Sequence, residues 1–298
     1  MKWSALGIAL LCHFVKLAFR ARAWQNILRA SYPETKLKYR STFGAYVAGV
    51  GVNSIAPARG GDVVKLYLVK HRAPEMTYPT LASTLAVETI LDFFVAGALM
   101  IWALSIGVLP THQVYSRIPT VDWKFFLRHE RVTGVALGVL LLAAVVLFFW
   151  ARRRVENFWE RVRLGFAILG DRRAFALGVL VPQAISWVFR IATLFFFLEA
   201  FGVHASIHNA LLAQVVDSLA TLFPATPGGA GTKQGLIVYL FRDSAVSKTL
   251  LLAFSVGMNI AITVANLALG LAAIALMAKT LSFKRLRHAS KQEQEQPA

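Results

Sequence analysis

Long apolar stretches alternate with short polar segments along the chain. About 20 consecutive apolar residues span a bilayer as a helix. The segment at 131–150 carries one charge, at its first residue, and the segment at 249–278 carries none. Such continuous runs favour helices over the alternating strands of a membrane barrel. We therefore predict an all-α, polytopic integral membrane protein with five full spans, at about 3–20, 80–109, 131–150, 174–201 and 249–278.

Two further apolar regions, 41–72 and 208–242, are interrupted near their middles. The first break reads NSIAPARGGD at 53–62, and the second reads LFPATPGGAGTKQG at 222–235. Proline and glycine in these positions break or kink a helix. Each region is therefore predicted to form two half-helices, which either cross the membrane together or enter and return.

The distribution of basic residues distinguishes these two arrangements. If both regions return, the basic segments 21–40, 65–79 and 151–173 share one side with the C-terminal tail at 283–298. If both cross, segment 151–173 lies opposite 21–40 and the asymmetry is lost. Because short cytoplasmic loops are enriched in Lys and Arg, we predict two re-entrant helical hairpins, an outside N-terminus and a cytoplasmic C-terminus.

The order of span, broken hairpin and span occurs twice, at about 3–109 and 174–278. The span at 131–150 links the two copies within a single domain, 1–282. With returning hairpins, three crossings separate the copies, so the repeat is predicted to be inverted. Paired segments interrupted by Gly and Pro indicate a transporter binding site near the bilayer midplane.

Composition changes this interpretation little. The net charge of +17 would suggest nucleic acid in a soluble protein, but 57% of residues are hydrophobic and only 16% are charged. The basic residues gather in the loops, so we expect no nucleic acid. Cys12 is the single cysteine, which excludes an intrachain disulfide and a multi-cysteine metal site. No histidine set has metal-ligand spacing and no catalytic set is visible, so we expect no metal, no cofactor and no enzymatic activity.

Polar residues at the first break suggest an anion site. Arg59 and Asp62 flank Gly60 and Gly61. A half-helix that starts at Asp62 or Val63 would point its positive end inward and, with Arg59, suit a lipid phosphate. Asp62 either caps this half-helix or pairs with Arg59. The alternative is that Arg59 extends to the interface and only fixes the hairpin.

The second break repeats this logic. Its glycines allow tight turns, and Lys233 follows in the first turn of the next helix, where we expect it to hold phosphate as Arg59 does. The alternative is a purely conformational turn with Lys233 at the interface. The segment is not a nucleotide-binding P-loop, because Lys233 is followed by Gln234 rather than by Ser or Thr.

Four charged residues lie inside apolar segments, where charge is costly and is a functional candidate. Glu88 and Asp92 are four residues apart on one face of a span. They would bind a proton or cation, or pair with Arg59 or Arg190. Asp217, before the second break, is a candidate partner for Arg190 or Lys233.

These residues carry a resemblance to a known family. NSIAPARGGDVVKLYLVKHR at 53–72, AVETILD at 86–92 and PATPGGAGTKQG at 224–235 resemble, in this order, the signatures of the lysylphosphatidylglycerol synthase transmembrane (flippase-like) family. Arg22-Ala23-Trp24 after the first span is similar to the family pattern. The resemblance covers about 3–280. The family usually has Glu near Gln234, so a carboxylate role at this position is in doubt. The family also usually begins with one more span, so this chain looks short at its N-terminus.

The resemblance implies a membrane domain that binds or translocates lipids. In bifunctional members it flips aminoacylated phosphatidylglycerol made by a separate cytoplasmic domain, for which this chain has no room. Stand-alone members handle other lipid-borne groups, including polyprenyl-linked sugars. We expect a protein of the cell membrane that binds or translocates a phospholipid or a polyprenyl-phosphate-linked lipid. The alternative is a non-catalytic scaffold subunit of an envelope-lipid or glycan biosynthesis system.

The expected partners are membrane lipids, with an envelope-biosynthesis enzyme and a second copy of the chain as further candidates. The expected intramembrane charge network is Glu88, Asp92, Arg190 and Asp217. The candidate headgroup-binding residues are Asn53, Arg59, Gly60, Gly61, Asp62, Lys65, Pro227, Gly228, Gly229, Gly231, Lys233 and Gln234.

Overall fold

The computed structural model describes residues 1–56, 60–106, 160–222, 231–241 and 246–294, and within these ranges every regular element is a helix. The elements are α1 (Trp3–Ser31), α2 (Tyr39–Asn53), α3 (Gly60–Arg72), α4 (Tyr78–Ser105), η1 (Ala167–Gly170), α8 (Arg172–Phe175), the π-helical turn η2 (Ala176–Leu180), α9 (Val181–Phe201), α10 (Ile207–Leu222), α11 (Thr232–Leu240) and α12 (Lys248–Gln294).

Within the described residues, four helical segments are long and apolar enough to cross a membrane. They are Trp3–Ser31, Tyr78–Ser105, Arg172–Phe201 and Lys248–Met277. These four segments coincide with four of the predicted spans, and the fifth, at 131–150, lies outside the described residues. Two ends differ from the prediction. Helix α1 continues to Ser31 because Trp24 and Leu28 pack into a buried cluster, and α12 continues to Gln294, past the predicted tail boundary.

The third of these segments contains a local irregularity that α1 compensates. Pro182 lies in the first turn of α9 and has no N–H, so the carbonyl of Gly178, four residues earlier, lacks its usual donor. The side-chain amide of Asn26 donates to this carbonyl at 2.7 Å. The contact fixes α1 against the π-helical turn and satisfies a backbone group that lipid cannot.

The first predicted hairpin is present as α2 and α3. At 1.5 Å per residue these helices are about 22 and 20 Å long, shorter than the roughly 30 Å hydrocarbon core. Leu37, before α2, and Ala73, after α3, belong to the same buried cluster, so the chain enters and leaves at one place. The helices pack so closely that a Cβ on Gly61 would overlap the carbonyl oxygen of Gly49.

The second hairpin is formed by α10 and α11, about 24 and 14 Å long. Ala210 near the start of α10 shares a buried cluster with Leu240 and Phe241 at the end of α11. Phe254 of α12 packs in the same cluster. This hairpin therefore also returns, while its break at 223–230 lies outside the described residues.

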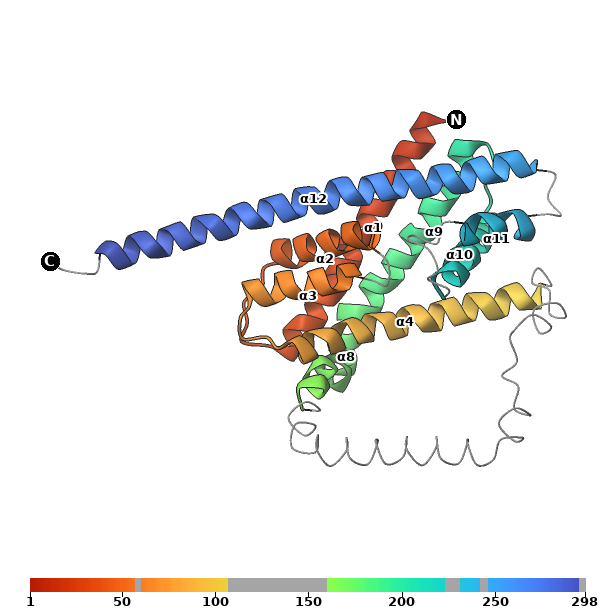
Figure 1. The fold of residues 1–298 in the computed structure, drawn as a ribbon. Coiled ribbons are helices and arrows are strands. Elements are labelled where there is room, and N and C mark those ends of the chain that lie inside the picture. The colour runs from red at the N-terminus through yellow and green to blue at the C-terminus, as the bar shows by residue number, and fades with distance from the viewer. Residues whose placement is uncertain (57–59, 107–159, 223–230, 242–245, 295–298) are drawn as a thin grey trace, which may run out of the picture.

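The arrangement of the helices relates the two halves of the chain. Helices α1 and α9 lie side by side through the centre and run in opposite directions (Figure 1). In this view α12 crosses the upper part of the pair and α4 the lower part, and these two helices also run in opposite directions (Figure 1). Each half supplies one central helix, one hairpin and one outer helix, as the inverted arrangement predicts.

Candidate functional site

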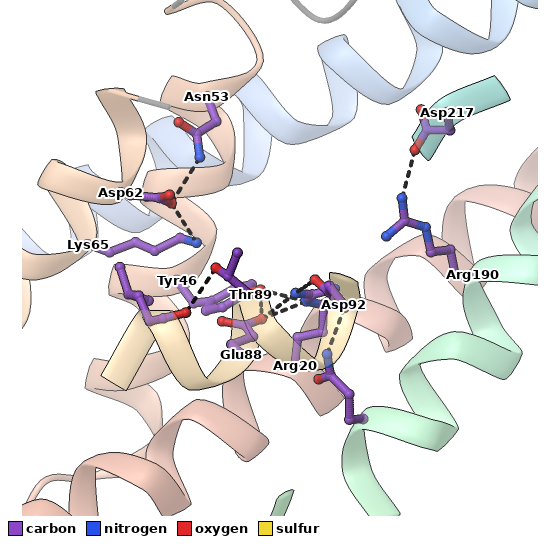
Figure 2. A network of polar contacts seen from close by, with 12 residues as sticks. Arg20, Tyr46, Asn53, Asp62, Lys65, Glu88, Thr89, Asp92, Arg190 and Asp217 are labelled. Atoms are coloured by element: carbon purple, nitrogen blue, oxygen red, sulfur yellow. Dashed lines mark hydrogen bonds and ion pairs between the residues drawn. The ribbon is translucent and has the colours of Figure 1, made fainter. Parts of the chain in front are cut away.

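Arg20 of α1 binds two carboxylates of α4 inside the helical bundle (Figure 2). Its Nη2 lies 2.6 Å from Glu88 Oε1 and 2.5 Å from Asp92 Oδ2. Its Nε donates to Glu88 at 2.7 Å and to the Tyr46 hydroxyl at 2.8 Å. Tyr46 in turn donates to Glu88 at 2.6 Å, and the Gln183 amide donates to Asp92 at 2.9 Å. One cation therefore joins α1, α2, α4 and α9 through this cluster.

This pairing differs from the prediction, which offered Arg59 or Arg190 as partners for Glu88 and Asp92. Arg20 lies at the predicted end of the first span, at about residue 20. The helix continues past it, however, so Arg20 lies in the helix interior. A signal was present in the sequence, because His13, Lys16 and Arg20 recur at spacings of three and four and so share one helix face.

A second polar cluster closes the tip of the first hairpin. The Gly61 N–H donates to Asn53 Oδ1 at 2.7 Å, and Asn53 Nδ2 donates to Asp62 at 3.1 Å. The Lys65 ammonium lies 3.0 Å from Asp62 and 4.2 Å from the centre of the Tyr46 ring. Helix α3 begins at Gly60 rather than at the predicted Asp62 or Val63, so Asn53 caps it and Asp62 lies within its first turn.

A third cluster joins α9 to the second hairpin. Asp217 of α10 lies 2.7 Å from Arg190 Nη2 and 2.6 Å from Lys233 Nζ. Arg190 also donates to Gln214 at 2.7 Å, and its guanidinium lies over the Trp187 ring at 4.7 Å. Both partners considered for Asp217 are therefore bound to it. Figure 2 shows the Arg190–Asp217 pair beside the Arg20 cluster.

A chain of hydrogen bonds connects α1 to α12 and to the tip of α2. Lys16 Nζ lies 3.0 Å from His13 Nδ1, and His13 Nε2 lies 2.8 Å from Asn266 Oδ1. Asn266 Nδ2 donates to Ser54 Oγ at 3.0 Å. Helices α2 and α12 approach closely here, because a Cβ on Gly51 would lie 2.8 Å from the Asn266 carbonyl oxygen.

Two cavities adjoin these clusters, and Arg20, Tyr46 and Arg190 line both of them. The larger has a volume of about 510 Å³. Its charged residues are three cations and three carboxylates: Arg20, Lys65, Arg190, Asp62, Glu88 and Asp92. Helix α4 supplies an apolar wall that includes Leu85, Phe93, Ala96 and Met100.

The smaller cavity has a volume of about 270 Å³ and a different charge balance. Its lining residues include four cations, Lys16, Arg20, Arg190 and Lys233, but the single carboxylate Asp217. Among the described residues, no three His, Cys, Asp or Glu side chains gather so that they would hold a metal ion.

The predicted headgroup residues are only partly brought together. Asn53, Asp62 and Lys65 line the larger cavity, and Lys233 lines the smaller one. Gly231 has a positive φ of 86° and is the residue immediately before α11, and its N–H donates to Gln234 Oε1 at 2.6 Å. The predicted residues Arg59, Pro227, Gly228 and Gly229 lie outside the described residues. Sequence reasoning missed His13, Lys16, Arg20, Tyr46, Gln183, Gln214 and Asn266.

Comparison with known proteins identifies relatives of the chain. It is 23% identical to a UPF0104 membrane protein of Methanothermobacter thermautotrophicus, over 93% of this chain and 86% of the relative. It is 27% identical to the glycosyltransferase AglD of Haloferax volcanii, over 76% of this chain and 41% of that protein. No solved structure matches the chain. The model of the lysylphosphatidylglycerol synthase TM region matches residues 1–270, and the chain therefore belongs to this membrane-protein family.

Proposed function

We propose that this protein binds a lipid by its headgroup inside the membrane and moves it between the two leaflets. The substrate would be a phospholipid or a polyprenyl-phosphate-linked lipid. The observation that carries the proposal is the larger cavity, which is lined by both charged and apolar side chains. A volume of about 510 Å³ lies within the range of small-molecule sites and would hold a headgroup rather than a whole lipid.

The two kinds of lining side chain match the two parts of a lipid. A headgroup that crosses the hydrocarbon core needs polar partners, because unsatisfied polar groups there are costly. The ion pairs of Arg20 with Glu88 and of Lys65 with Asp62 provide such partners without a net charge. The acyl or polyprenyl chain would lie along α4, where Phe93 and Phe94 are 68% and 69% exposed.

A second candidate function is that of a non-catalytic scaffold for a lipid or glycan biosynthetic enzyme. The observation that favours it is the likeness to the glycosyltransferase AglD, of which the matched region forms only 41%. A region similar to this chain is thus part of a longer chain whose name denotes an enzyme. Stable co-purification of such an enzyme, together with no lipid movement in liposomes, would favour the scaffold over the translocator.

The orientation proposed for the cell membrane places the C-terminus in the cytoplasm. Lys36, in the loop at 32–38, would be cytoplasmic, and His204, in the loop at 202–206, would be outside; both are exposed. Single cysteines at these positions in a Cys12→Ala background test it. An impermeant maleimide should label His204→Cys in intact cells and Lys36→Cys only after permeabilisation. The reverse pattern would overturn the orientation.

The cavity itself is tested by filling it. Gly97 lines the larger cavity, and a Cβ added there meets no atom within 4 Å. Gly97→Phe should therefore occupy the cavity without disturbing the packing of the helices. Gly7→Phe is the matched control, because Gly7 is exposed on α1 and also has open space around it.

The assay uses liposomes that contain purified protein and fluorescent phosphatidylglycerol, with dithionite added outside. If the protein moves this lipid, dithionite bleaches more than the outer half of the fluorescence. Gly97→Phe should slow the additional bleaching at least about tenfold, a barrier increase of about 1.4 kcal/mol. Gly7→Phe should leave it unchanged. Equal rates in both variants would remove the larger cavity from the proposal.

A further inference from the structure

The smaller cavity carries a charge imbalance that no described residue corrects. Of its four cations, Arg20 is bound by Glu88 and Asp92, which belong to the larger cavity. The remaining three, Lys16, Arg190 and Lys233, face the single carboxylate of Asp217. Asp217 binds Arg190 and Lys233, and no ion pair of the described residues reaches Lys16. An unneutralised ammonium inside a membrane is costly and indicates an anionic ligand.

Neighbouring side chains hold Lys16 in place without neutralising it. Asn266 donates its amide to Ser54, so its Oδ1 is the atom that faces His13 Nε2. That contact is a hydrogen bond when Nε2 carries the proton, which leaves the His13 Nδ1 lone pair to accept from Lys16. A neutral histidine thus orients the Lys16 side chain beside the cavity without adding a carboxylate.

We propose that the smaller cavity is an anion site that binds the phosphoryl group of the lipid, with Lys16 as its dedicated counter-ion. The proposal rests on the proposed function and deepens it by assigning the two parts of a headgroup to two cavities. Charge-assisted hydrogen bonds from ammonium and guanidinium groups are the usual means of binding phosphate oxygens. Lys233 and Arg190 contribute further donors, and Arg190 also lines the larger cavity.

The division between the cavities follows from their charge and size. The positive cavity of about 270 Å³ suits a compact anion, and the balanced cavity of about 510 Å³ suits the uncharged or zwitterionic remainder of a headgroup. Arg20, Tyr46 and Arg190 form the wall common to both. A headgroup bound beside these three residues would place its phosphate among the cations of the smaller cavity and its remaining part among the mixed polar groups of the larger cavity.

The test measures lipid binding to the purified full chain in a maltoside detergent, which contains no phosphate. The probes are a short-chain phosphatidylglycerol, a diacylglycerol with the same chains and inorganic phosphate, and native mass spectrometry or calorimetry gives each Kd. Lys16→Gln should weaken phosphatidylglycerol binding about tenfold, equivalent to about 1.4 kcal/mol. Diacylglycerol binding should not change, because it lacks the phosphate.

Two variants complete the design. Lys36→Gln removes one cation at an exposed position and should bind phosphatidylglycerol as the wild type does. Lys16→Arg keeps the charge and should retain most of the affinity. If Lys16→Gln does not fold, as judged by its elution and melting, Lys233→Gln is used in its place, with the same selective loss expected.

The outcomes separate this inference from the proposed function. Unchanged phosphatidylglycerol binding in Lys16→Gln overturns the anion site but leaves lipid binding intact. An equal loss for diacylglycerol also overturns it, because the effect would not depend on phosphate. If the wild type binds inorganic phosphate but not the lipid, and Lys16→Gln loses the phosphate binding, the anion site is supported and is assigned to a free ion. The absence of lipid binding by the wild type contradicts the proposed function.

Discussion

Replacing Arg20 by Gln removes the cation that joins Glu88 and Asp92 across the contact between α1 and α4. The cluster then holds two carboxylates and no cation. Glu88 is only 5% exposed, so its charge cannot be hydrated where it lies. Removing one partner of a buried ion pair costs about 3–5 kcal/mol. We expect a loss near the lower end, about 3 kcal/mol, because the Asp92 side chain is 28% exposed and remains partly hydrated.

Asp92→Asn provides a sharper comparison than the wild type alone. This change leaves Arg20 paired one to one with Glu88, and the oxygen of the new side-chain amide still accepts from Gln183, in place of the carboxylate that accepts at 2.9 Å. We therefore expect a smaller loss of about 1 kcal/mol. Lys2→Gln is the surface control, because the Lys2–Glu199 pair at 3.3 Å involves a lysine side chain that is 66% exposed. Such pairs contribute roughly 0–1 kcal/mol.

The assay is denaturant unfolding of the purified variants in detergent, followed by the loss of helical circular dichroism. The free energy of unfolding should be highest for Lys2→Gln, lower for Asp92→Asn and lowest for Arg20→Gln. A value for Arg20→Gln within about 0.5 kcal/mol of the wild type, the usual range for surface substitutions, would refute the reasoning. So would a larger loss for Asp92→Asn than for Arg20→Gln.

Two further predictions concern the backbone. Gly61→Ala should disrupt the first hairpin and lower the melting temperature, because the new Cβ would overlap the Gly49 carbonyl oxygen. Gly60→Ala should be tolerated, because its Cβ would lie 3.4 Å from the Ala56 side chain. Equal melting temperatures of the two variants would contradict the close packing of α2 and α3. Asn26→Ala should lower the free energy of unfolding by about 1–3 kcal/mol, because the Gly178 carbonyl loses the hydrogen bond from the Asn26 amide. The loss should be smaller in a Pro182→Ala background, where residue 182 gains a backbone N–H. A double-mutant cycle that shows no coupling between the two changes would reject this role for Asn26.

The positions of the spans and hairpins could be predicted from the sequence because a membrane imposes simple rules. A run as apolar as 249–278 has few other stable locations than the hydrocarbon core. The Pro and Gly residues between 53 and 62 divided the first hairpin near the observed break between Asn53 and Gly60. The end of α1 was missed, because hydropathy falls at Arg20 although the helix continues to Ser31.

The partner of Glu88 and Asp92 was decided only by the tertiary structure. Helical spacing places Glu88 and Asp92 on one face, yet it does not say which helix that face meets. In a soluble protein the apolar stripe of a helix would identify its buried face, but lipid is as apolar as the protein interior. Helix α4 accordingly exposes Phe93 and Phe94 and buries Glu88.

The sequence by itself determined that this chain crosses the membrane repeatedly, where its helices break and that it carries charge within the bilayer. The tertiary structure decided that Arg20 rather than Arg190 binds Glu88, and that Lys16 lies beside a cavity with few carboxylates. The reason is physical. Span positions follow from local hydropathy, whereas the pairing of charges depends on which helix faces come together, and their separation in sequence, 68 residues between Arg20 and Glu88, sets no limit on that.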